Sequence, residues 1–119
     1  MSTGPEQLRD RTKAFAIRIV RLYRSLPKTT EAQVLGKQLL RCGTSVAANY
    51  RAVCRARSKA EFIAKLGVVV EEADETVFWL ELLADTDVME MQRLSDLLRE
   101  AQELVAIVAA SQRTARANR

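Results

Sequence analysis

Apolar residues recur along most of this chain at alternating steps of three and four positions, which places them on one side of an α-helix. Four such stripes follow one another, and short polar or proline-containing stretches separate them. They predict helices at about residues 6–26, 30–56, 59–84 and 88–111. Val-rich alternating runs, which would indicate strands, are missing, so the pattern favours an all-α chain.

The residues on the four stripes form the predicted core. The first two helices contribute Leu8, Thr12, Phe15, Ile19, Leu22, Leu26 and then Leu35, Leu39, Cys42, Val46, Asn49 and Val53. The last two contribute Phe62, Leu66, Val69, Ala73, Thr76, Leu80, Leu83 and then Met91, Leu94, Leu98, Ala101, Val105 and Val108. Four amphipathic helices joined by short turns pack most economically as an antiparallel up-and-down four-helix bundle.

Turn and cap residues mark the predicted helix ends. Pro27 ends the first helix, because the residue before a proline is pushed away from helical backbone. Ser58 followed by Glu61 is a capping box, in which the serine side chain accepts from the amide three residues on and the glutamate reaches back. Asp87 with Glu90 repeats this pattern and predicts the start of the fourth helix.

The length and composition of the chain fit one domain. A chain of 119 residues with 48% apolar content can bury one core, so residues 1–119 are predicted to form a single domain. No stretch approaches the roughly 18 consecutive apolar residues of a membrane span, and the N-terminal residues lack an apolar signal region. We therefore expect a cytoplasmic protein without membrane contact.

Charge is divided unevenly along the chain. Residues 1–65 carry 14 Lys/Arg against 4 Asp/Glu, a net charge of +10, whereas residues 66–110 carry 2 against 11, a net charge of −9. Arg113, Arg116 and Arg119 bring the total to +4. This asymmetry predicts either a polyanion-binding face or a basic surface that meets an acidic one in an oligomer.

A cationic stripe on the second predicted helix is the candidate nucleic-acid site, and it consists of Lys37, Arg41, Arg51 and Arg55. The four residues lie within about 40° of one direction around a helix. Arg18 and Arg21 of the first helix widen this patch if they face the same way. No aromatic residues are interleaved with the stripe, so contact with phosphates is expected rather than base stacking. The alternative is a solvated face, or a row of salt bridges to the acidic third helix.

Several polar and aromatic residues are candidates for structure or assembly: Ser45, Asn49, Ser58, Glu61 and Trp79. Asn49 falls on the buried stripe, where an amide that bonds across the bundle can fix register or partner number, with ligand binding as the alternative. Ser45, one turn earlier, is expected to bond Asn49 or its own preceding carbonyl. Trp79 and its neighbour Phe78 diverge by about 100°, so one of them reaches outward. Trp79 packs at the core or its rim, or else at a subunit interface.

The acidic third helix raises the question of a metal site, because it carries Glu71, Glu72, Asp74, Glu75 and Glu81. The chain contains no histidine, however, which removes the Glu-x-x-His ligands of di-iron bundles and the usual imidazole base. A solvated acidic face or an inter-subunit surface is the preferred interpretation.

The two cysteines do not suggest catalysis either. Cys42 and Cys54 are about 18 Å apart on one predicted helix, too far for a bridge, and both are expected to be buried thiols. There is no histidine to pair with them and no Gly-rich phosphate loop. We therefore predict neither an enzyme nor a bound metal or cofactor.

Two segments resemble a known family. They contain the pattern of Ser45, Asn49, Arg57, Ser58, Glu61 and Phe62, and the block Trp79-Leu80-Glu81-Leu82-Leu83. Together they are similar to the small four-helix-bundle proteins encoded in intervening sequences of bacterial 23S ribosomal RNA genes, and the resemblance spans nearly the whole chain. Many members have a Glu-Gly pair soon after the asparagine, where this chain has Ala52 and Val53.

The resemblance carries its own expectations. It implies a homopentamer, hence a ring, of a protein whose biochemical role is unsettled. Distant relatives include accessory proteins of diversity-generating retroelements, which are basic pentameric barrels that bind nucleic acid and a reverse transcriptase. The predicted function is thus a non-enzymatic ring with a basic surface for RNA or DNA. The alternative is a structural or protein-binding oligomer, including a reverse-transcriptase accessory protein.

Overall fold

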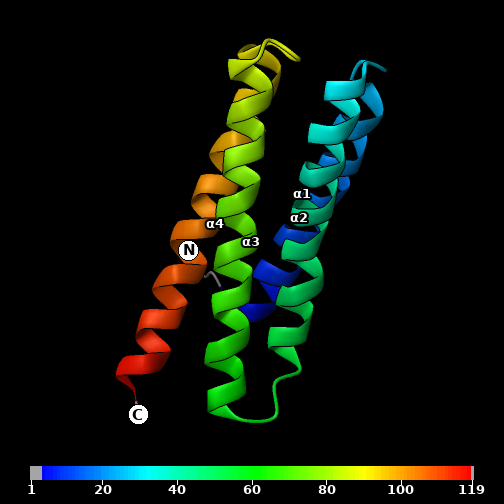
Figure 1. Cartoon of the computed structure of the whole chain (residues 1–119). Coiled ribbons are helices and arrows are strands. Elements are labelled where there is room, and N and C mark those ends of the chain that lie inside the picture. The colour runs from blue at the N-terminus through cyan, green and yellow to red at the C-terminus, as the bar shows by residue number, and fades with distance from the viewer. Residues whose placement is uncertain (1–3, 119) are drawn as a thin grey trace.

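The computed structural model describes residues 4–118, which contain four α-helices and no strand (Figure 1). The helices are α1 (Pro5–Ser25), α2 (Thr30–Cys54), α3 (Lys59–Asp85) and α4 (Met91–Ala117). The predicted all-α class and four-helix pattern are therefore confirmed. Within the described residues, no helix is both long and apolar enough to span a membrane.

Local sequence explains most of the helix starts. Pro5 opens α1, where its fixed φ suits the first turn and no backbone N–H is needed. The Thr29 hydroxyl caps α2 by accepting from the amide of Ala32 at 3.3 Å. The Ser58 hydroxyl caps α3 by accepting from the amide of Glu61 at 3.0 Å, as predicted.

The start of α4 differs from the prediction. Asp87 has a φ of 60°, in the left-handed region, whereas an N-cap residue needs extended backbone. The chain instead turns through Asp87, and the amides of Val88 and Met89 both donate to the carbonyl of Leu83, at 3.0 and 3.3 Å. Helix α4 begins three residues later than expected, after Glu90, whose side chain makes no cap hydrogen bond.

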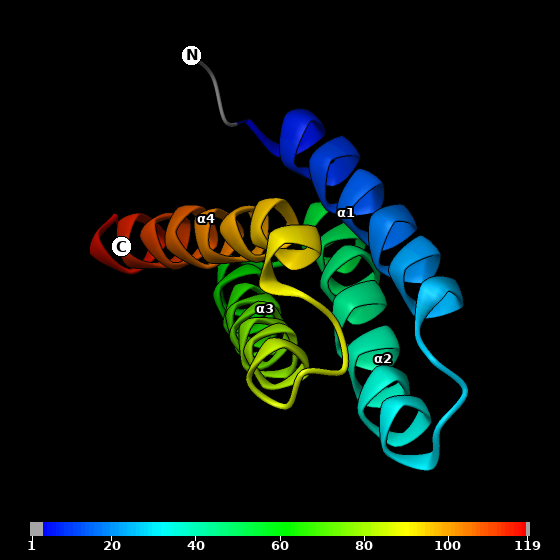
Figure 2. The same cartoon turned by 90° about the horizontal axis from the view of Figure 1, so that it is seen from above.

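The four helices pack around one hydrophobic core to which each of them contributes. α1 packs on α2, α2 on α3, and α3 on α4, whereas α1 meets α4 over a much smaller area (Figure 2). On that side Arg11 links α1 to α4, because its Nε and Nη2 atoms both donate to the Glu100 carboxylate at 2.7 Å. The Arg11–Glu100 pair bridges the side where the two helices contact each other least.

α1 lies very close to α2 because two glycines of α2 face it. A Cβ atom on Gly43 would lie 2.8 Å from Cγ1 of Ile19, and one on Gly36 would lie 2.6 Å from Cδ1 of Leu26. Both glycines are buried. Tyr50 continues the same face seven residues after Gly43 and is also buried.

Two of the predicted core stripes are shifted in the structure. Tyr50 rather than Asn49 is buried on α2, and Asn49 lies at the edge of the core. On α4 the buried positions are Leu94, Leu97, Ala101, Leu104 and Val108, whereas Met91 is 46% exposed and Leu98 and Val105 are half-buried. The α1 and α3 stripes are buried as predicted, apart from the half-buried Leu22 and Phe62.

Candidate functional site

The cations predicted as one stripe on α2 do not form one surface in the folded chain. Lys37, Arg51 and Arg55 are exposed and have no ion pair among the described residues. Lys37, however, lies about 21 Å along the helix from Arg51. Arg41, between them, is directed at α3, so only Arg51 and Arg55 remain as neighbours.

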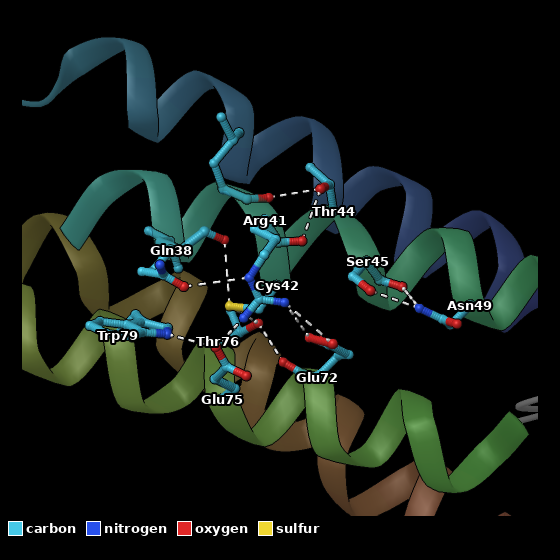
Figure 3. Close-up of polar contacts among 12 residues, drawn as sticks. Gln38, Arg41, Cys42, Thr44, Ser45, Asn49, Glu72, Glu75, Thr76 and Trp79 are labelled. Carbon is cyan, nitrogen blue, oxygen red and sulfur yellow. Dashed lines mark hydrogen bonds and ion pairs between the residues drawn. The ribbon is translucent and has the colours of Figure 1, made fainter. Parts of the chain in front are cut away.

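Arg41 takes part in a polar network between α2 and α3 (Figure 3). Its Nη1 atom donates to Glu72, with 3.4 Å to Oε2, and its Nη2 atom donates to Oε2 of Glu75. The same Glu75 oxygen accepts from the indole Nε1 of Trp79 at 3.0 Å. Below this network the Thr76 hydroxyl contacts the sulfur of Cys42 at 3.2 Å.

Arg41 is already paired with two carboxylates, those of Glu72 and Glu75. The hydrogen bond to Glu75 raises the pKa of the Arg41 guanidinium, and the bonds from Trp79 and then Arg41 lower the pKa of the Glu75 carboxyl. Arg41 thus follows the alternative interpretation, a salt bridge to the acidic helix. A phosphate at Arg41 would have to displace two carboxylates.

Arg51 and Arg55 lie across an open cleft from two cations of α1. Arg9 and Lys13 line one side of the cleft, and Arg51 and Arg55 line the other. Ala47 and Ala48 also line the cleft, which has a volume of about 540 Å³ and also touches Asp10 and Cys54. We call this site the basic cleft. Each helix supplies a pair spaced four residues apart, which places both members on one face of that helix.

The electrostatics of the basic cleft favour an anion. Among the described residues, the four cations of the cleft form one ion pair. It joins Arg9 Nε to Asp10 Oδ1 at 3.8 Å and is largely exposed to water. In the same part of the chain, Lys13, Arg51 and Arg55 have no carboxylate partner. Guanidinium groups bind phosphate oxygens through paired N–H bonds, and an ammonium binds them as a point charge. No aromatic side chain of residues 4–118 lines the cleft.

The cysteines have different environments. Cys54 at the rim of the basic cleft is exposed, which corrects the expectation that both thiols are buried. Cys42 is buried under the polar network, and burial raises the pKa of its thiol.

Arg18 and Arg21 do not widen the basic cleft. Arg18 lies on the opposite side of α1 from Arg9, since nine residues correspond to two and a half turns. Both arginines line a separate depression between α1 and α4, of about 350 Å³. We call it the α1–α4 hollow, and it is lined by Arg18, Arg21, Leu22, Ser25, Arg93, Asp96 and Leu97.

Ser45 and Asn49 bond to each other within α2. The Nδ2 atom of Asn49 donates to the carbonyl oxygen of Ser45 at 2.9 Å and to its Oγ at 2.7 Å (Figure 3). The expected Ser45–Asn49 bond is therefore present, but within the described part of the chain Asn49 does not bond across the bundle. A role in assembly stays a prediction.

The other assembly candidates lie on α3 or at its start. Glu61 does not reach back to complete the capping box but forms long ion pairs with Arg57 and Lys65, at 3.8 and 3.9 Å. Trp79 is half-buried, whereas its neighbour Phe78 is 52% exposed and meets it edge-on, with ring centroids 4.9 Å apart.

Sequence reasoning missed three of the residues that matter here. Arg9 and Lys13 have the same four-residue spacing as Arg51 and Arg55. That spacing alone does not show which face of α1 lies against which face of α2. For Phe78 the sequence did give a signal, because neighbouring residues on a helix point about 100° apart and Phe78 and Trp79 cannot both face the core. Among residues 4–118, no group of three or more His, Cys, Asp or Glu side chains is placed to hold a metal ion.

Comparison with known proteins points to one family. The model of the 23S rRNA-intervening sequence protein family matches residues 7–110. A crystal structure at 1.70 Å resolution, of a protein with unknown function from the S23 ribosomal protein family of Bacteroides thetaiotaomicron, is 35% identical. Its TM-score is 0.85, and the match covers 92% of this chain and 97% of that chain. Among curated proteins, none matches this chain.

Proposed function

The chain belongs to the 23S rRNA-intervening sequence protein family, and on that premise we propose that it is a non-catalytic cytoplasmic protein that binds RNA or DNA through the basic cleft. The proposal includes an antiparallel up-and-down bundle and its assembly into a homopentameric ring. One observation carries the binding role: four cations from two helices converge on an open cleft, and three of them have no carboxylate partner among residues 4–118.

The chemistry of the cleft favours the nucleic-acid backbone over the bases. Sequence-independent binding needs several cations placed to neutralise phosphates, with release of bound counterions. Base stacking needs aromatic side chains, and none of the described residues that line the basic cleft is aromatic. The small side chains of Ala47 and Ala48 leave room for a strand to approach the arginines. We therefore expect little dependence on base sequence.

Assembly would strengthen this binding. One cleft with four exposed cations makes few phosphate contacts, so its affinity alone is modest. A ring presents several copies of the cleft to one strand, and linked sites can exceed the affinity of a single site by a factor of about 100 or more.

The test is fluorescence anisotropy with a labelled single-stranded RNA and a labelled DNA duplex, titrated between about 50 and 200 mM salt. Arg51→Gln with Arg55→Gln should weaken binding and flatten the plot of log affinity against log salt by about 0.7 to 0.9 for each phosphate that is no longer neutralised. Arg113→Gln with Arg116→Gln is the matched control, since it removes the same charge from exposed positions at the end of α4. The control should keep the wild-type slope.

Two results would contradict the proposed site. Equal decreases in affinity in both double variants would mean that net charge alone attracts the nucleic acid. No binding by the wild-type protein at physiological salt would favour the alternative, a structural or protein-binding oligomer such as a reverse-transcriptase accessory protein. Oligomer mass measured on the same samples shows whether the substitutions disturb assembly.

A further inference from the structure

Phe78 is an exposed aromatic residue on an acidic face of α3. Its side chain is 52% exposed, and among residues 4–118 it is the largest exposed apolar side chain. Asp74 and Glu81 flank it within one helical turn, both are exposed, and neither forms an ion pair among the described residues. We call these three residues the Phe78 face. A complementary surface would offer an apolar depression with cations around it.

The α1–α4 hollow of the same chain has those properties. The half-buried Leu22 supplies most of its apolar surface, since Leu97 at its base is only 6% exposed. Arg18, Arg21 and Arg93 supply cations that have no ion pair within the described part of the chain. Guanidinium groups also bind the faces of aromatic rings. The acid in its lining, Asp96, lies 3.6 Å from Arg99 of its own helix.

The two surfaces lie at the same end of the molecule but on different helices. Phe78 is seven residues from the end of α3, about 10 Å. The hollow is built from the last two turns of α1 and the first turns of α4. Figure 1 shows the end of α3, the end of α1 and the start of α4 together at its upper end. Side-by-side copies of the chain would therefore bring one copy's Phe78 face level with the other's hollow.

We propose that the Phe78 face inserts into the α1–α4 hollow of a second copy of this chain. Such a contact joins two different surfaces, so it repeats from copy to copy and closes into a ring when the rotation fits. The inference rests on the ring assembly proposed above and names the contact that forms it. The basic cleft between α1 and α2 takes no part in this contact and stays open in each copy.

Mass measurements on two complementary variants test the contact. Phe78→Lys disables the Phe78 face, because its ammonium would meet the arginines of the hollow, and it leaves the hollow intact. Arg21→Glu with Arg93→Glu disables the hollow and leaves the Phe78 face intact. Each variant alone should fall from the ring mass to that of the 13.4 kDa chain. Mixed together, the two retain one working contact and should form a dimer of twice that mass. Val34→Lys is the control, because Val34 is 56% exposed on α2 and lies outside both surfaces, and the ring of this variant should persist.

Each outcome decides between the ring and this particular contact. A monomeric wild-type protein at micromolar concentration would overturn the ring and this inference together. A ring that forms in the wild type and persists in Phe78→Lys would overturn the contact alone. Monomers that do not pair on mixing would likewise mean that Phe78 and the hollow do not meet. Should Phe78→Lys lose helicity by circular dichroism, Phe78→Ser replaces it with the same expectation, since the Phe78 side chain is half exposed.

Discussion

Gly43 is the position where one added methyl group tests the packing of α1 on α2. A Cβ atom there would lie 2.8, 2.9 and 3.1 Å from Cγ1, Cγ2 and Cδ1 of Ile19. Ile19 is fully buried, and its β-branched side chain has one strongly preferred rotamer in a helix. Gly43→Ala therefore either strains Ile19 or pushes α1 away from α2.

The magnitude follows from two opposing effects. Alanine is favoured over glycine inside a helix by about 1 kcal/mol, whereas overpacking a core costs about 1–3 kcal/mol. Three close contacts to a side chain that cannot move place Gly43→Ala in the upper half of that range. We expect a net decrease of about 1–2 kcal/mol in the free energy of unfolding. Gly67→Ala is the matched control: its Cβ would meet only the Nε2 atom of Gln112, which can shift if its 3.1 Å hydrogen bond to the Ile63 carbonyl weakens. The helix gain of about 0.5–1 kcal/mol and the loss of about 0.5–1.5 kcal/mol from that bond oppose each other, so little net change is expected.

Urea unfolding followed by circular dichroism, at one fixed protein concentration, measures these differences. A second test combines Gly43→Ala with Ile19→Ala, which alone costs about 2–5 kcal/mol. In the double variant the clash is absent, so the destabilisation should be smaller than the sum of the two single values by at least about 0.5 kcal/mol. Additive values, or a Gly43→Ala protein as stable as wild type, would refute this account of the α1–α2 contact.

Two further predictions concern titratable side chains. Cys54 is exposed and Cys42 is buried, so a thiol reagent should modify Cys54 in the native protein and Cys42 only on unfolding. Rapid modification of both thiols in the native protein would contradict the burial of Cys42. Burial raises the pKa of Tyr50 to about 12, from an ordinary value of 10.0. The neutral phenol should therefore contribute its full stabilisation below pH 10, and this contribution should be lost as the pH rises through about 12. Tyr50→Phe should flatten this alkaline part of the stability profile in urea titrations, and an unchanged profile would exclude Tyr50 as its source.

The amphipathic pattern identified the buried stripe of α1, which is the clearest of the four, and also that of α3, although α3 carries the exposed apolar residues Val68 and Phe78 on other faces. It failed for α4, where Leu97 and Leu104 compete with Leu98 and Val105 for the core. Both sets have helical spacing, so the choice depends on how the neighbouring helices pack. The pattern also could not indicate the backbone conformation of Asp87, which a turn with left-handed geometry determines.

On α2 the missing information was the role of glycine. Gly36 and Gly43 are buried because α1 approaches there, but a residue without a side chain adds nothing to an apolar stripe. The face of α2 that meets α1 was therefore overlooked, and Asn49 was assigned to the core in place of Tyr50. For the same reason the residues that α1 contributes to the basic cleft could not be deduced. They depend on which face of α1 packs against the two glycines.

The charged residues of the chain form several groups with different consequences. Some pairs join the basic and acidic halves internally, such as Arg11 with Glu100 and Arg41 with Glu75. Within residues 4–118, most cations of the basic cleft and both acids of the Phe78 face have no ion pair, and they lie on separate helices. A free monomer would therefore present an acidic surface that repels a polyanion as well as a cleft that attracts it. In the proposed ring those acids pair with the arginines of the neighbouring copy's α1–α4 hollow, and the basic cleft keeps its unpaired cations exposed. Assembly would thus direct a polyanion to the basic cleft, because it covers the cations of the hollow as well as the acids of the Phe78 face.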